Sequence, residues 1–401
     1  MKPNPVIGLV LIVALLTVSC GGEPEQEASS EWTGTVEVTD GVTVVRNPAQ
    51  PLLGQLTLEL EEDLVVGDTL HEESFFFNLI YGGIDGSGNL FIWDPNSFRI
   101  QVFDAEGRFV RTVGRQGEGP GEFSDAFGLK FRVGVRGELA GLDGGRLQLF
   151  DTSGAYERRV LMPPMTTRFA ILAGGRILQD QMGSAGDGPT EEVVLMDETG
   201  DLVQRLASYP SEKWRGAIID RLRFTHLAPE LVLAPWGNQA GTYGFPLAYR
   251  VTLVGEDGRI VRAIEVDEPP LEVDSELEDA LIEDASSDAP GRTPRDLDGE
   301  VYIPETWPFF DAIFSDENGN LLVQRSEPLP EPDAERRLDL FTAEGVYLYD
   351  LRVPVDDIQA VQNGFLYVRR FDRDMNVGQL VRYRILNWAV IAEAAAQHPL
   401  P

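Results

Sequence analysis

The sequence has few of the residues on which many enzymes depend. Its 401 residues contain one cysteine, Cys20, and three histidines, His71, His226 and His398. A single cysteine excludes an intramolecular disulfide. Two histidines in the folded region disfavour a histidine-ligated zinc site or a Ser-His-Asp triad, and no Gly-x-Ser-x-Gly elbow occurs. The sequence therefore favours a protein that is not an enzyme.

Positive charge is also scarce. The chain has 33 Lys and Arg against 66 Asp and Glu, a formal net charge of -33 at pH 7. The only lysines are Lys2, Lys130 and Lys213. A surface this negative repels phosphate backbones and anionic lipid headgroups. Nucleic acid is thus excluded as a partner, and the protein surface is not expected to dock on a membrane by charge.

The N-terminus predicts export. A short positive start and the apolar run Val6–Leu16 are typical of a secretory signal peptide over residues 1–19, too short to span a membrane. The run ends in Leu-Thr-Val-Ser-Cys20, which resembles the lipobox of bacterial lipoproteins. This resemblance implies that Cys20 is lipidated and becomes the first residue of the mature protein. The alternative is a plain secretory peptide with an incidental cysteine.

A nine-residue pattern recurs along the rest of the chain. Segments 99–107, 146–154 and 337–345 align without gaps, and weaker copies lie at 192–200 and 250–258. Each has an apolar β-rich run, usually followed by Asp-x-x-Gly, which is a turn signal for a tight hairpin. A period near 45 residues with this content predicts a β-propeller with about four strands in each blade.

One stretch carries a family resemblance. Gly86–Asp94, Arg99–Asp104, Gly107 and Gly114–Phe123 together resemble an NHL repeat. The whole chain is similar to the six-bladed β-propeller lipoproteins of bacteria. The resemblance implies an all-β, NHL-like fold of six four-stranded antiparallel blades over residues 34–388, in a ring closed by an N-terminal strand.

The repeats also predict where the blades lie. The expected blades are 75–114, 124–163, 167–208, 224–266, 308–354 and 356–388. Residues 34–45 are strand-like and are expected to complete the last blade, because a closed ring leaves no open edge. Residues 52–70 are expected to add edge strand or rim structure.

Three segments fall outside the blades. Residues 20–33 are polar and predict a flexible tether, and residues 389–401 are expected to be a C-terminal tail. Residues 267–307 form an insertion between blades four and five. It predicts a short helix that Ser275 caps, with the apolar stripe Leu277, Ala280 and Leu281. A solvated acidic excursion is favoured for it over a lid.

The longer connections of a propeller share one face and usually carry binding. The candidate binding face comprises Trp93, Asp94, Arg99, Arg115 and Gln116. A structural alternative exists for two of them: Trp93 packing between blades, and Asp94 capping its own turn.

No cofactor is assigned. Asp85-x-Ser-x-Asn and Asp316-x-Asn-x-Asn resemble calcium loops, yet both lack the glycine that such a loop needs at its sixth position. Tight hairpin turns explain both stretches. Calcium or another divalent ion held by carboxylates elsewhere stays open.

The favoured function is a monomeric, lipid-anchored module of the cell envelope that binds a protein, peptide or glycan. The alternative is a divalent-metal-dependent hydrolase or lyase, similar to propeller lactonases, with carboxylate ligands in the central channel. A third interpretation is a purely structural envelope component.

Overall fold

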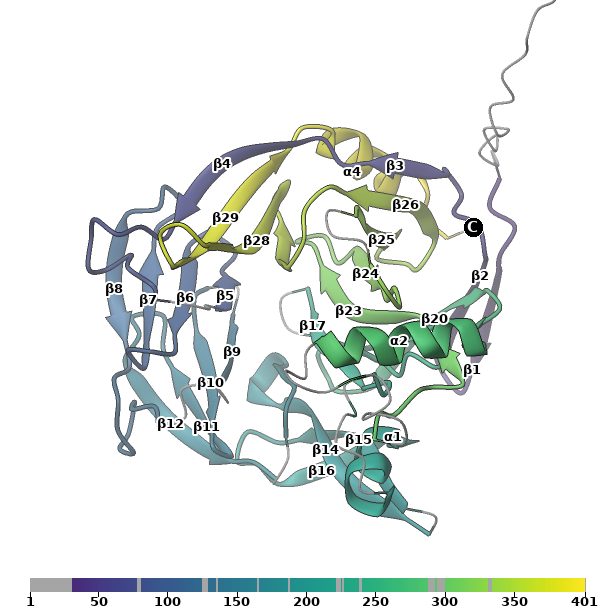
Figure 1. Cartoon of the computed structure of the whole chain (residues 1–401), viewed down its shortest axis with the longest axis horizontal. Helices are drawn as coiled ribbons and strands as arrows, with labels where there is room; N and C mark the ends of the chain where they lie inside the picture. Colours follow the sequence, from purple (N-terminus) through teal and green to yellow (C-terminus); the bar gives the residue numbers. More distant parts are fainter. Residues whose placement is uncertain are drawn as a thin grey trace, which may run out of the picture.

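The computed structural model describes residues 31–77, 81–124, 129–134, 136–163, 166–186, 188–220, 225, 227–237, 240–287, 293, 300–330 and 334–400. Six sheets stand around a central axis, so the predicted six-bladed β-propeller is confirmed (Figure 1). Cys20 and the tether up to residue 30 lie outside the described residues, as does His226.

Blades one to three each contain four consecutive antiparallel strands, with the first strand innermost. Blade one has β5 (Tyr81–Ile84), β6 (Leu90–Asp94), β7 (Arg99–Phe103) and β8 (Phe109–Val113). Blade two has β9 (Lys130–Val133), β10 (Leu139–Asp143), β11 (Arg146–Phe150) and β12 (Tyr156–Leu161). Blade three has β13 (Phe169–Ile171), β14 (Ile177–Ala185), β15 (Gly188–Met196) and β16 (Leu202–Pro210), with the 3-10 turn η1 (Ala173–Gly175) between β13 and β14.

Blades four to six differ because N-terminal strands join their outer edges. Blade four has β17 (Val232–Trp236), β18 (Ala240–Gly244), β19 (Arg250–Val254) and β20 (Ile260–Asp267). Blade five has β23 (Phe310–Ser315), β24 (Leu321–Arg325), β25 (Arg336–Phe341) and β26 (Tyr347–Val353). Blade six has β27 (Ile358–Gln362), β28 (Phe365–Asp372) and β29 (Val377–Ile385).

The N-terminal strands form a belt, residues 35–66, around these three blades (Figure 1). After the hairpin of β1 (Thr35–Thr39) and β2 (Val42–Pro48), β2 runs parallel to β20 of blade four. β3 (Gln55–Thr57) runs parallel to β26 of blade five. β4 (Leu60–Val66) pairs antiparallel with β29 and is the fourth strand of blade six.

An N-terminal strand thus closes the ring, as predicted, but it is β4. The expectation that residues 34–45 complete the last blade was wrong, because they lie at the rim of blade four. The expectation of edge strand within 52–70 is confirmed by β3. The difference arises because the chain covers the outer edges of blades four and five before it reaches blade six.

Asn47 fastens the belt to the ring. Its side chain is buried and accepts hydrogen bonds from the backbone N–H of Tyr347 (2.9 Å) and from Nε1 of Trp32 (3.0 Å). It donates to the carbonyl oxygens of Gly345 (2.9 Å) and Glu265 (3.3 Å). One amide therefore joins the belt to both blade four and blade five.

The repeated Asp-x-x-Gly segment forms the expected hairpin turn. In blade one the Asp104 carboxylate accepts hydrogen bonds from the backbone N–H groups of Glu106 (3.1 Å) and Arg108 (2.9 Å). Gly107 has φ of 78°, the left-handed conformation that glycine adopts without strain. The turn chemistry therefore accounts for the period that the sequence shows.

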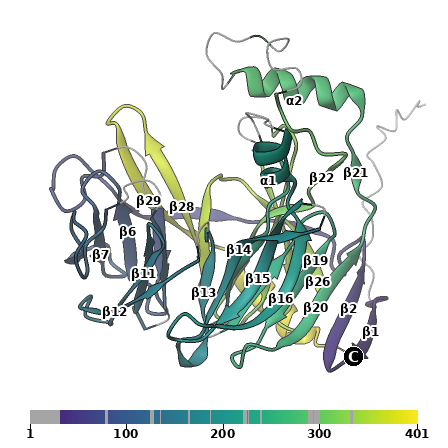
Figure 2. The ribbon, with the colours of Figure 1, turned by 90° about the horizontal axis from the view of Figure 1, so that it is seen from below.

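The insertion after blade four projects from one face of the ring (Figure 2). It contains β21 (Leu271–Glu272), α2 (Ser275–Ser287) and β22 (Thr306–Trp307). The predicted helix is confirmed, but its cap is Asp274, whose carboxylate accepts from the N–H groups of Glu276 and Leu277. Of the predicted apolar stripe, Leu281 is buried, whereas Leu277 and Ala280 are half-buried; Ala285, one turn after Leu281, is also buried.

Short helices complete the described chain. α1 (Glu212–Trp214) and the π-helical turn η2 (Arg215–Asp220) follow blade three, on the same face as α2 (Figure 2). α4 (Trp388–Gln397) forms most of the C-terminal tail and buries Ile391 in the core beside blades five and six. Among the described residues, no helix combines the length and apolar character needed to cross a membrane.

Candidate functional site

The innermost strands of all six blades enclose a central cavity of about 660 Å³. This volume is within the range of small-molecule sites. Its wall is made largely of glycine and aliphatic residues from these strands, among them Gly82, Gly83, Ile84, Val133, Ile171 and Val232. Charged side chains also line the cavity, among them Arg132, Arg168 and Asp311.

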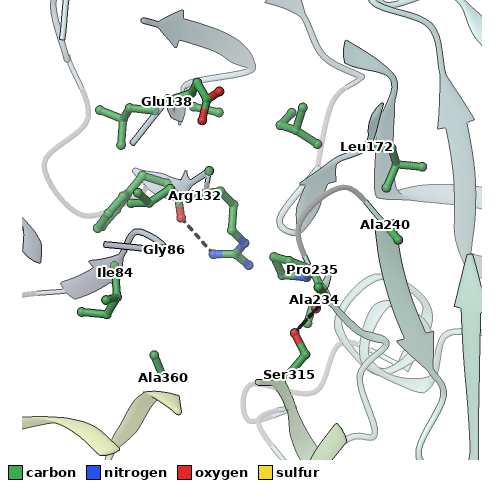
Figure 3. Close-up of a pocket in the computed structure, with 18 of the residues that line it drawn as sticks. Ile84, Gly86, Arg132, Glu138, Leu172, Ala234, Pro235, Ala240, Ser315 and Ala360 are labelled. Carbon is green, nitrogen blue, oxygen red and sulfur yellow. Dashed lines mark hydrogen bonds between the residues drawn. The ribbon is translucent and has the colours of Figure 1, made fainter. Parts of the chain in front are cut away.

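Arg132, on β9 of blade two, extends into this cavity (Figure 3). Its Nη1 donates to the carbonyl of Phe131 (2.9 Å) and its Nε donates to the carbonyl of Phe169 (3.2 Å). The guanidinium carbon lies 5.7 Å from the centre of the Phe169 ring. Among the described residues, no carboxylate forms an ion pair with Arg132 within 4.0 Å, although the charge of Asp180 acts on it from farther away. Burial, together with the nearby charge of Arg168, lowers the pKa of Arg132 to about 10.

Arg168 also lines the cavity, but acidic partners engage it. It pairs with Glu230 (2.9 Å) and lies 3.8 Å from Asp180. Lys213, in α1, also binds Glu230 (2.5 Å). Burial alone would raise the pKa of Glu230, yet the hydrogen bond from Lys213 and the charge of Arg168 hold it below its ordinary value. The positive charges of Arg168 and Lys213 are therefore balanced by the carboxylates of Glu230 and Asp180.

Asp311 lies on blade five, opposite Arg132 in a ring of six. Its side chain is accessible from the channel and accepts a hydrogen bond from Nε2 of Gln324 (2.9 Å). Protein surrounds the channel on every side, and this burial raises the pKa of Asp311 to about 6. The cavity wall thus presents a cation on one side and an acid that titrates near neutrality on the other.

A cation-π cluster lies where blade six meets blades one and two. Arg369 pairs with Asp357 (2.6 Å) and lies 5.2 Å from the centre of the Tyr81 ring. Lys130 lies 6.0 Å from the same ring. Two of the three lysines in this acidic chain thus lie near innermost strands. Lys130 is the first residue of β9, and Lys213 contacts Glu230, two residues before β17.

Two members of the candidate binding face are buried. Trp93 is fully buried and packs edge-to-face on Phe123, with the ring centres 5.2 Å apart. Asp94 is also buried and accepts from the N–H of Asn96 (3.1 Å) in its own turn. Neither side chain is accessible to a ligand, so placing them on a binding face was wrong. Instead, Trp93 packs between blades one and two, and Asp94 caps its own turn, as the structural alternative predicted.

The other three members are nearer the surface. Arg99 is partly buried, 3.4 Å from Asp94, and donates to the carbonyl of Glu72. Arg115 is exposed and pairs with Glu122 (2.8 Å). Gln116 forms a single β-bridge with Phe123. The structure does not bring these residues to the central cavity, and a binding role for Arg115 and Gln116 stays a prediction.

The two calcium-like loops are hairpin turns. Asp85 and Asp316 are buried, and each accepts a side-chain hydrogen bond from the asparagine four residues on, Asn89 (2.8 Å) and Asn320 (2.7 Å). Their carboxylates therefore complete their own turns. Within the described residues, no group of three or more His, Cys, Asp or Glu side chains is placed to hold a metal ion.

Sequence reasoning missed Arg132, Arg168 and Asp311. None of them lies in the repeated motif, which marks the outer hairpin of each blade. The available signal was a charged residue inside or directly before the short apolar first strand of a unit, as in Phe131-Arg132-Val133. First strands line the axis of a propeller, so a charge there points to the channel.

Comparison with known proteins agrees with this architecture. Residues 83–129 match the model of a family described as "6-bladed beta-propeller". No match was found among curated proteins. An exported protein from Bacteroides fragilis is similar in fold at 13% identity and a TM-score of 0.51, covering 85% of this chain and 99% of its own.

Two further solved structures are more distant. A member of the DUF4221 family from Bacteroides vulgatus has 12% identity and a TM-score of 0.47, covering 82% of this chain and 98% of its own. A gluconolactonase from Xanthomonas campestris has 11% identity and a TM-score of 0.39, covering 77% and 88%. The six sheets around one axis show that the chain is a six-bladed β-propeller, and residues 83–129 match a family described in those words.

Proposed function

We propose that this protein is a lipid-anchored binding module of the bacterial cell envelope, which holds part of an envelope protein, peptide or glycan in its central channel. The observation that carries the proposal is the cavity of about 660 Å³ enclosed by six first strands. Such a cavity on a rigid scaffold is the usual form of a ligand site.

The sequence supports the location. The signal peptide and the lipobox at Cys20 would place the mature protein outside the cytoplasm, held by acyl chains. The net charge of -33 keeps the rest of the surface away from anionic headgroups. The ligand would therefore be met in the envelope rather than on the lipid surface.

The arrangement of the loops supports access from one face. The connections between consecutive blades carry α1 and α2, and the long β28–β29 hairpin projects on the same side (Figure 2). They stand on one face of the ring, and none of their residues belongs to the cavity wall itself. They offer the adaptable contacts of a binding module, while the sheets beneath them stay fixed.

A large side chain in the channel tests this proposal. Ala312, on β23, lines the cavity and is half-buried. We expect Ala312→Trp to abolish capture of the ligand by the full chain from an extract of the producing cell's envelope. The matched control is Leu202→Trp on the outer strand β16, where the leucine is exposed. Equal capture by both variants would refute a channel site.

The metal-dependent alternative has its own discriminator. It needs carboxylate or amide side chains from several blades around one ion, and Asp311 is the acid best placed to contribute. Elemental analysis of the full chain, purified without chelator, separates the two functions. A stoichiometric divalent ion with lactone turnover that Asp311→Asn abolishes would replace the binding module by the enzyme.

A further inference from the structure

We infer that the channel ligand carries a carboxylate, that Arg132 binds this group, and that the aliphatic wall holds the ligand's apolar body. The inference rests on the proposed function, since it names the ligand class for the same cavity. It concerns Arg132, the cavity guanidinium on an innermost strand that makes no ion pair with the described carboxylates.

The first step is the cost of leaving Arg132 unpaired. A buried cation without a counter-ion loses hydration and gains no Coulomb energy in return. Two other arginines on the cavity wall avoid this: Arg136 pairs with Glu138, and Arg168 pairs with Glu230. The remaining one, Arg158, lies on the outer strand β12 and donates to the carbonyl of Glu198. Arg132 has only two backbone carbonyls as hydrogen-bond partners among the described residues. An anion that enters the channel would remove this cost.

The second step is orientation. The carbonyls of Phe131 and Phe169 hold Nη1 and Nε, while the Phe169 ring lies against the guanidinium. The side chain is thereby held in place, with its guanidinium extending into the cavity (Figure 3). A donor fixed before binding loses little conformational entropy when the ligand arrives. This is the arrangement expected of a recognition residue.

The third step is the charge of the ligand. One unpaired guanidinium matches one negative charge, and the nearest second cation, Arg168, already has Glu230 and Asp180 as partners. A phosphate dianion would need two. Elsewhere the cavity wall includes the aliphatic side chains of Val133, Ile171 and Val232. A monocarboxylate on an apolar body satisfies both features, either as a short organic acid or as the free C-terminus of a peptide.

Thermal unfolding of the full chain in detergent tests the inference. At constant ionic strength, chloride is replaced by butyrate or by N-acetyl-alanyl-alanine, and inorganic phosphate and N-acetyl-alanyl-alanine amide serve as comparisons. We expect the Tm to rise by about 2 °C with a carboxylate near tenfold over its Kd. A larger rise with the dipeptide assigns a peptide terminus, and a larger rise with butyrate assigns an organic acid.

Variants show whether Arg132 is responsible. Arg132→Gln should abolish the rise in Tm. Arg132→Lys keeps the charge and should retain part of the rise, so it tests the same inference if the glutamine variant does not fold. Arg136→Gln, a paired arginine at the rim of the same cavity, should respond as the wild type does. The inference is overturned by an equal rise in Arg132→Gln, by no rise with either carboxylate, or by a rise with phosphate alone. Those results leave the Ala312→Trp test untouched, so failure of the ligand class and failure of the channel site can be told apart.

Discussion

Replacing Asn47 by alanine should destabilise the whole ring, although the residue lies outside the four repeated strands of any blade. Its amide makes four hydrogen bonds, and two of them reach backbone groups between blades four and five. Alanine leaves the N–H of Tyr347 and the carbonyl of Gly345 without those partners. A buried polar group left unsatisfied costs about 1–3 kcal/mol.

The expected loss follows from this count. Two unsatisfied groups at about 1–2 kcal/mol each give about 3 kcal/mol, since Trp32 and Glu265 are partly exposed and exchange their bonds for water at small cost. Urea unfolding followed by tryptophan fluorescence measures the change as a lower midpoint at unchanged slope. Asn318→Ala is the control, because the Asn318 amide makes one long bond of 3.5 Å to Glu317. A loss below about 1 kcal/mol for Asn47→Ala would show that the belt does not depend on this amide.

Three further outcomes are expected. The pKa of Asp311 is raised to about 6 from an ordinary 3.8, so the folded protein favours the neutral acid. Protonated Asp311 therefore contributes to the free energy of unfolding fully below pH 3.8, and this contribution is lost as the pH rises through 6. Asp311→Asn should therefore be more stable than the wild type at pH 7.5 by no more than about 1 kcal/mol, since the group is exposed to channel water, and equally stable near pH 4. Trp93→Ala should lower the free energy of unfolding by about 4 kcal/mol in urea titrations, because the ring fills the core between blades one and two. Cys20→Ser should move the protein from the membrane fraction to the soluble fraction in cell fractionation, and a variant that stays with the membrane contradicts the lipid anchor.

The blades were predictable because their turns are local. Asp104 and Gly107 fix a hairpin through contacts within five residues, and Asp151 and Asp197 make the same contacts in blades two and three. The belt was not predictable in the same way. β2 reads as a strand, but nothing in its sequence states that its partner is β20 rather than β29, because that choice depends on the path of the chain around the rim.

The site was harder to predict than the fold. Trp93 ends the apolar run Leu-Phe-Ile-Trp, all of it buried, and an apolar run without alternation is itself a sign of a fully buried strand. Arg132 offers no such sign. The sequence of its strand predicts only that Arg132 lies near the axis. Whether a carboxylate reaches it depends on residues that other blades contribute to the cavity.

The belt also has a consequence for how the chain reaches its native state. Val66, near the start of the chain, pairs with Leu380, near its end, and Asn47 accepts a hydrogen bond from the backbone N–H of Tyr347. Contacts this distant along the sequence form slowly, because closing the long loop between them costs chain entropy before the contacts stabilise the fold. The segment that is synthesised first is thus among the last to find its partners. Until blades five and six are synthesised, β3 and β4 lack their partner strands β26 and β29 and are prone to aggregation, so folding of this protein should depend on chaperones that protect nascent strands.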